Sequence, residues 1–195
     1  MNQPIIDNCR DDLFIKEQID GKTYLMARPS DEHEAIQSNI AYLFSDYFRK
    51  SKKACRVKNE AELRIDKNNW LVPDLMVFCY ATDKNIPLLV IEILSKSTRA
   101  KDFGIKMAKY AEIGVAEYWI VDTKYFAIDI YLLGDARKYA FYKSYAYYTE
   151  EDFSKFSEIR EEQESGLEMI SEFSPVSFPE MKILLEEVFY YIKEE

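Results

Sequence analysis

Two apolar runs that each carry one carboxylate constrain this chain more than any other feature. The first is "PDLMVFC" at 73–79, and the second is "PLLVIEILSKST" at 87–98. Short apolar runs of this kind are typical of buried strands. Asp74 lies in the first run and Glu92 in the second. A buried carboxylate costs free energy unless it shifts its pKa, finds a partner or binds a cation. The sequence therefore predicts two buried strands, each with a carboxylate that needs a shifted pKa, a partner or a cation.

The two acids can converge if the two strands are neighbours in one sheet. Successive side chains of a strand point to opposite faces, so Asp74 shares a face with Phe78, and Glu92 shares one with Val90. A divalent cation at the sheet rim would then neutralise two acids that otherwise repel, and Mg²⁺ suits a site of one or two carboxylates plus water and phosphate oxygens. The alternative is that both are structural acids, held by backbone amides or arginines.

A helix predicted at 99–113 follows the second strand. Asp102, Lys106 and Tyr110 are spaced four apart and form one stripe on it. A lysine near the metal could orient the attacking water or offset charge on a phosphoryl group. The alternative is a plain i,i+4 ion pair between Asp102 and Lys106, which would contribute only a few tenths of a kcal/mol.

The sequence lacks the motifs of several other kinds of catalytic or binding site. The chain has one histidine, His33, and no CxxC pair, which argues against a zinc site of the Cys/His kind. It has no GxSxG elbow, no GxxxxGK[ST] loop and no GxGxxG loop. His33 lies near a predicted helix start, so a capping or packing role is favoured over acid–base chemistry.

The remaining pattern predicts a mixed α/β (α+β) domain over residues 1–195. A hairpin turns at Asp20-Gly21, a helix covers 32–50, and "FPEMKILLEEVFYYI" is expected to form a C-terminal amphipathic helix. The acidic segment 150–164 is expected to be an exposed helix. A central mixed sheet should lie between the helices at 32–50 and 99–113.

Charge and cysteine content indicate partners and compartment. The net charge is −9, yet the segments 49–58 and 96–109 are rich in Lys and Arg, so any nucleic-acid affinity should lie there. The three cysteines are widely spaced and odd in number, which indicates reduced thiols. With neither a secretory signal nor an apolar run long enough for a membrane span, a cytoplasmic protein without membrane contact is expected.

The motifs "PDLMVFC", "IEILSKST", "KDFGIKMAKYAEIGVAEYWIVD" and "SFPEMKILLEEVF" resemble the Uma-two family of small bacterial proteins. This family is placed in the PD-(D/E)XK restriction-endonuclease-like superfamily, and the resemblance covers essentially the whole chain. It implies a restriction-endonuclease-like core. It also implies that Asp74, Glu92 and the backbone carbonyl of Ile93 bind Mg²⁺ or Mn²⁺.

The resemblance leaves the lysine of the motif to be assigned. The usual lysine position is Leu94 in this sequence, a departure from the superfamily pattern. The family pattern points instead to Lys106 on the following helix, oriented by Asp102, with Lys96 as the alternative. On this basis we expect Lys106→Ala to abolish cleavage while leaving the fold nearly intact.

The function implied by the resemblance is metal-dependent hydrolysis of phosphodiester bonds, with DNA as the expected partner. Two alternatives remain. One is a catalytically silent nucleic-acid-binding or interaction module of the same fold. The other is a carboxylate–metal hydrolase that acts on RNA or nucleotides. A homodimer is left open.

Overall fold

A six-stranded mixed sheet forms the centre of the protein. The computed structural model describes residues 14–80, 86–95, 99–149, 151–152 and 170–190. The sheet has the order β10-β9-β8-β7-β6-β3. Only β7 and β8 are parallel, and the other neighbours are antiparallel. The strands are β3 (Cys55–Asn59), β6 (Leu75–Cys79), β7 (Leu89–Ile93), β8 (Glu117–Asp122), β9 (Ala127–Leu133) and β10 (Tyr139–Ala146).

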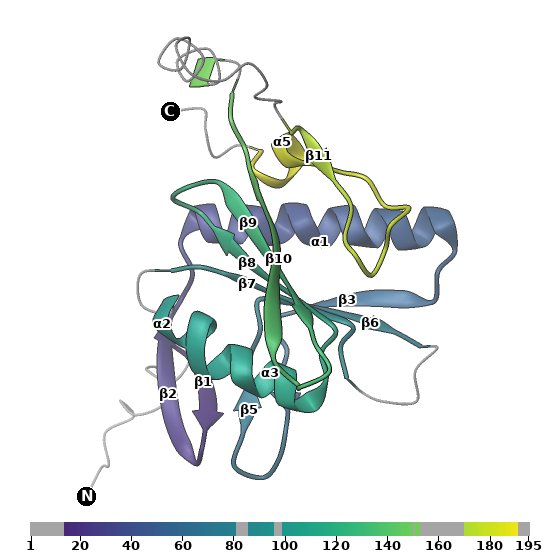
Figure 1. The fold of residues 1–195 in the computed structure, drawn as a ribbon. Coiled ribbons are helices and arrows are strands. Elements are labelled where there is room, and N and C mark those ends of the chain that lie inside the picture. The colour runs from purple at the N-terminus through teal and green to yellow at the C-terminus, as the bar shows by residue number, and fades with distance from the viewer. Residues whose placement is uncertain (1–13, 81–85, 96–98, 150, 153–169, 191–195) are drawn as a thin grey trace, which may run out of the picture.

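Helix α1 (Asp31–Ser51) covers one face of this sheet, as Figure 1 shows. Ser30 caps its first turn by accepting a hydrogen bond from the backbone N–H of His33, and acidic residues in that turn favour the helix dipole. Its apolar stripe, which includes Ile40 and Phe44, packs against Trp119 and other buried residues of the sheet. The helix predicted at 32–50 is confirmed.

The opposite face carries a smaller sheet and a helical segment (Figure 1). The smaller sheet has the order β2-β1-β5-β4. Its strands are β1 (Phe14–Ile19), β2 (Lys22–Ala27), β4 (Leu63–Arg64) and β5 (Trp70–Leu71). Asp20 and Gly21 both have positive φ, as the predicted two-residue hairpin turn requires.

The helical segment between β7 and β8 changes its winding part of the way along. It begins as α2 (Arg99–Lys101), continues as a π-helical turn η2 (Asp102–Lys106) and ends as α3 (Met107–Ile113). Gly114 ends the helix in the left-handed conformation, with φ of 90°. A second apolar cluster, including Leu94, Tyr110 and Tyr118, fills the space between this layer and the central sheet. The helix predicted at 99–113 is confirmed, but the π-helical turn was not predicted.

The prediction of a long C-terminal helix is wrong. Within the described residues, the segment contains only the short helix α5 (Leu185–Val188), preceded by the strand pair β11 (Glu172–Phe173) and β12 (Ile183–Leu184). Met181, Ile183 and Leu185 are buried at every second position, which is the period of a strand rather than of a helix. Most of the acidic segment 150–164 lies outside the described residues.

The interpretation of the cysteines as reduced thiols is wrong for two of them. Cys55 and Cys79 are direct register partners on β3 and β6 and form a disulfide with a Cα–Cα distance of 4.0 Å. Because β3 was not predicted from the basic run that contains it, the sequence alone did not bring these residues together. Cys9 lies outside the described residues. A cytoplasmic location stays a prediction, and it loses the support that the cysteines gave it.

None of the helices in the described segments is long and apolar enough to cross a lipid bilayer.

Candidate active site

Asp74, immediately before the start of β6, lies opposite Glu92, near the end of β7. The register pairs Leu75 with Ile91, so one further antiparallel step sets Asp74 opposite Glu92 on the same sheet face. Both side chains line one cavity of about 380 Å³, together with Ile93 and Lys106. The expected convergence of the two acids is therefore present.

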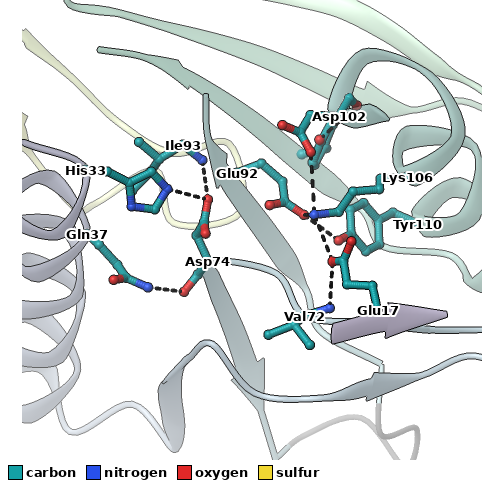
Figure 2. A network of polar contacts seen from close by, with 11 residues as sticks. Glu17, His33, Gln37, Val72, Asp74, Glu92, Ile93, Asp102, Lys106 and Tyr110 are labelled. Atoms are coloured by element: carbon teal, nitrogen blue, oxygen red, sulfur yellow. Dashed lines mark hydrogen bonds and ion pairs between the residues drawn. The ribbon is translucent and has the colours of Figure 1, made fainter. Parts of the chain in front are cut away.

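Asp74 is held by groups from three directions. Its Oδ2 atom accepts a hydrogen bond from the Ile93 backbone N–H at 2.6 Å and lies 3.2 Å from Nε2 of His33. Its backbone carbonyl accepts a hydrogen bond from the Gln37 amide at 2.8 Å (Figure 2). Both His33 and Gln37 come from α1, so the helix fixes the first acidic residue from the side.

Glu92 lies deeper, between Asp74 and Lys106 (Figure 2). It is 2% exposed, and its Oε1 atom accepts a hydrogen bond from the Tyr110 hydroxyl at 2.5 Å. Burial raises the pKa of Glu92 well above its ordinary value; Lys106 opposes this shift, whereas Asp102, Asp74 and Glu17 add to it. Burial and the charge of Glu92 also raise the pKa of Tyr110, so its hydroxyl stays protonated and can donate.

Lys106 places a positive charge among the buried carboxylates beside this cavity. Its Nζ atom is 2.7 Å from Oε1 of Glu92, 3.1 Å from Oε1 of Glu17 and 3.5 Å from Oδ1 of Asp102. Burial alone would lower the pKa of Lys106, but Glu92, Glu17 and Asp102 outweigh burial and raise it. The side chain is 1% exposed, so Lys106 is a fixed ammonium group and not a mobile surface charge.

The helical segment has its π-helical turn next to the site. The turn runs from Asp102 to Lys106, and the Tyr118 hydroxyl donates to the Asp102 carbonyl at 3.0 Å. A π-helical turn adds a residue to the helix and recurs at functional sites. Leu94, at the usual lysine position of the superfamily, is 5% exposed and belongs to the apolar cluster. Lys106 of the helix places its ammonium beside Glu92, whereas Lys96 lies outside the described residues, so the assignment of the motif's lysine stays a prediction.

Sequence reasoning missed Glu17, which lies on β1. Glu17 is fully buried, accepts a hydrogen bond from the Val72 backbone N–H at 2.9 Å and contacts Lys106 through the same oxygen. Glu17 thus connects the β1–β2 hairpin to Val72, which directly precedes Pro73 and Asp74. The alternation of Ile15, Glu17 and Ile19 was the signal that could have shown Glu17 on the buried face.

His33 lies beside the site and contacts Asp74, a contact that the favoured capping or packing role did not specify. It is 6% exposed and lines the same cavity as Asp74. Burial alone would lower the pKa of His33, but the hydrogen bond and the charge of Asp74 raise it overall. Its distance from Asp74 in the sequence hid this contact.

The residues present fit a divalent cation. Asp74 and Glu92 line the cavity, and Glu17 and Asp102 contact the buried lysine beside it. Burial raises the pKa of Glu92, and the neighbouring carboxylates add to that shift. Oxygen donors of this kind suit Mg²⁺ and Mn²⁺. Among the described residues no group of three His, Cys, Asp or Glu side chains is arranged for a metal. Mg²⁺ requires only one or two carboxylates, because water and substrate oxygens complete its shell.

The arrangement of the sheet and helices defines the fold class. A central mixed sheet with helices on its faces matches a restriction-endonuclease-like nuclease fold. The chain belongs to the Uma2 family, described as "Putative restriction endonuclease", which matches residues 9–164.

Two known proteins are similar to this chain. The crystal structure of "a putative nuclease belonging to DUF820" from Anabaena variabilis has a TM-score of 0.64, covers 91% of this chain and 90% of its own, and is 18% identical. That likeness establishes the fold. "Uncharacterized protein slr1290" from Synechocystis is 31% identical over 129 residues, or 61% of this chain. The match spans just under two thirds of that relative, at 66%. The family and the structural neighbour both carry nuclease descriptions.

Proposed function

We propose that this protein is a metal-dependent endonuclease that hydrolyses phosphodiester bonds in DNA. The observation that carries the proposal is the convergence of Asp74, Glu92 and Lys106 on one cavity at a strand rim. Family membership and the fold support a nuclease. The metal requirement and the choice of DNA go beyond that support and are the content of the proposal.

Asp74 and Glu92 would hold the cation, with the Ile93 carbonyl as the backbone ligand. Bound Mg²⁺ or Mn²⁺ supplies Lewis acidity toward the scissile phosphate and lowers the pKa of the attacking water. The contacts of Asp74 with Ile93 and His33 fix the orientation of one ligand. The hydrogen bond from the Tyr110 hydroxyl fixes the orientation of Glu92, the other ligand. Such neighbours orient metal ligands and tune their affinity.

Lys106 would stabilise the charge that develops on the phosphoryl group. Its ammonium lies 2.7 Å from Glu92, and it is held from behind by Glu17 and Asp102. A preorganised positive charge in a buried site acts on the transition state without reorganisation. Glu17 and Asp102 are positioning residues in this scheme, because they act through Lys106.

A cleavage panel tests the proposal. Supercoiled plasmid, linear duplex, single-stranded DNA and RNA are incubated with the purified protein and Mg²⁺, Mn²⁺ or EDTA. The expected result is metal-dependent nicking or cutting of DNA that is lost in EDTA and in Asp74→Asn. Glu32→Gln, a change in another acidic residue that lines the cavity, is the matched control and should retain activity.

The same panel separates the alternatives. Cleavage confined to RNA would replace DNA as the substrate. Binding of nucleic acid without cleavage under any metal condition would overturn the proposal and support a silent binding module. The homodimer and the cytoplasmic location stay predictions.

A further inference from the structure

Most of the basic residues that were predicted to bind nucleic acid have acidic partners. In the run 49–58, Arg49 and Lys50 both bind Asp46, and Lys53 binds Glu180 at 3.2 Å. Asp46 and Glu180 thus offset part of the positive charge of this run. The run is therefore not a uniform basic face.

The second run shows the same pattern in its described part. Arg99 pairs with Asp122, Lys109 pairs with Asp20 at 2.9 Å, and Lys106 is buried in the site. The basic character of both runs thus reduces to a few side chains.

Two of those side chains, Arg56 and Lys58, lie on β3 and pack over aromatic rings instead of carboxylates. The Lys58 ammonium is 4.7 Å from the centre of the Phe78 ring. The Arg56 guanidinium is 6.0 Å from the centre of Phe78 and 5.0 Å from that of Tyr80. Within the structure's described ranges neither cation forms an ion pair. We call these four residues the basic–aromatic strip.

The basic–aromatic strip lies on the same sheet face as the site. Arg56 is the register partner of Phe78, and Phe78 shares its face of β6 with Asp74. Tyr80 is six positions beyond Asp74, or about 20 Å away at roughly 3.3 Å per residue. β3 is the edge strand of the six-stranded sheet, and Tyr80 is 63% exposed. The exposed end of the strip therefore lies at the edge of the sheet, and the buried Met76 separates it from Asp74 on this face.

We propose that the basic–aromatic strip binds an unpaired DNA strand at the sheet edge, outside the site of Asp74 and Glu92; this inference rests on the proposed nuclease function. Cations held over rings can contact successive phosphates, while an exposed ring offers a base a stacking surface. Bases offer their faces for stacking only when they are unpaired. The chain as a whole carries −9, so a duplex that lay broadly across the surface would be repelled, whereas a single strand need meet only the strip.

Fluorescence anisotropy tests the strip under conditions that prevent hydrolysis. A labelled 20-nucleotide single strand and its duplex are titrated with the full chain, with Ca²⁺ replacing Mg²⁺. We expect the single strand to bind at least about tenfold more tightly. Tyr80→Leu should weaken single-strand binding roughly tenfold through lost stacking. Arg56→Gln and Lys58→Gln should each reduce the slope of log K against log salt by about 0.7.

Tyr142→Leu is the matched control for Tyr80→Leu. Tyr142 is 54% exposed and lies on β10, at the opposite edge of the same sheet. Its substitution should leave binding unchanged. Thermal melts of each variant establish that the fold is retained, and the salt slopes of the two surface cations give a readout that does not depend on Tyr80.

The outcomes separate this inference from the proposed function. Three results would each overturn the proposal that the strip binds an unpaired strand, whatever the protein cleaves. They are equal effects of Tyr80→Leu and Tyr142→Leu, unchanged salt slopes, and equal affinity for duplex and single strand. A protein that binds as expected but cleaves nothing with Mg²⁺ or Mn²⁺ would retain the strip and lose the nuclease assignment.

Discussion

Replacing Lys106 with methionine should destabilise the protein in a pH-dependent way. The sequence alone led us to expect that removing this lysine would leave the fold nearly intact. The structure changes that expectation, because the ammonium is 1% exposed and contacts Glu92, Glu17 and Asp102. Removing one partner of a buried ion pair costs about 3–5 kcal/mol, since the other partner is left uncompensated.

The pH dependence follows from Glu92. Its folded pKa is already raised, so the folded state holds a proton that the unfolded chain releases above about pH 4.3. Stability from this group is present at low pH and is lost as pH rises toward the folded pKa. Lys106 lowers that folded pKa, so Lys106→Met raises it further. The variant should keep losing stability at pH values where the wild type has levelled off, by about 1.4 kcal/mol for each additional pKa unit.

Urea unfolding at pH 5.5 and pH 8.0 measures this difference. We expect Lys106→Met to be destabilised more at pH 8.0 than at pH 5.5, and Glu92→Gln in the same chain to restore part of the loss. Lys109→Met is the control, because Lys109 lies one turn further along the helix and pairs with a largely exposed Asp20. Lys109→Met should lower the free energy of unfolding by less than about 1 kcal/mol. A loss independent of pH, or a double variant no more stable than Lys106→Met, would refute the reasoning.

Three further predictions concern neighbouring features. Glu92→Gln should abolish cleavage and lower the free energy of unfolding at pH 8 by less than the about 3–5 kcal/mol of a broken buried pair, because Glu17 and Asp102 still face Lys106; a variant more stable than the wild type in urea would contradict this. Glu17→Gln should lower kcat about 10- to 100-fold with KM nearly unchanged, because Glu17 acts through the lysine; steady-state kinetics showing only a raised KM would argue against it. Replacing Cys55 and Cys79 by serine should cost about 3 kcal/mol, given their separation of 24 residues, without affecting cleavage; equal urea midpoints would mean that the bridge does not stabilise the protein.

The elements with strong local signals could be predicted from the sequence. The two acid-bearing strands are short apolar runs, and the stripe of Asp102, Lys106 and Tyr110 follows from helical spacing. These signals were sufficient to propose that Asp74, Glu92 and Lys106 lie together. The structure brings them together, and their roles in catalysis stay predictions.

The contacts that were missed join segments far apart in the sequence. Glu17 reaches Lys106 from the N-terminal hairpin, and His33 reaches Asp74 from α1, so no local pattern specifies either contact. β3 was hidden because Arg56 and Lys58 alternate with its half-buried residues, and the segment was interpreted by its charge alone. The disulfide was missed for the same reason, because Cys55 lies on β3 and faces Cys79 only through the pairing of β3 with β6.

Manganese binding measured by isothermal titration calorimetry tests the central claim most directly. The account predicts a Mn²⁺ site in the wild type that is lost in Asp74→Asn and retained in Glu32→Gln. It also predicts proton release on binding, seen as a heat that varies with the ionisation enthalpy of the buffer, because the cation binds the ionised carboxylate of Glu92, whose pKa burial raises. Unchanged Mn²⁺ affinity in Asp74→Asn would contradict the claim that this strand rim is a metal site.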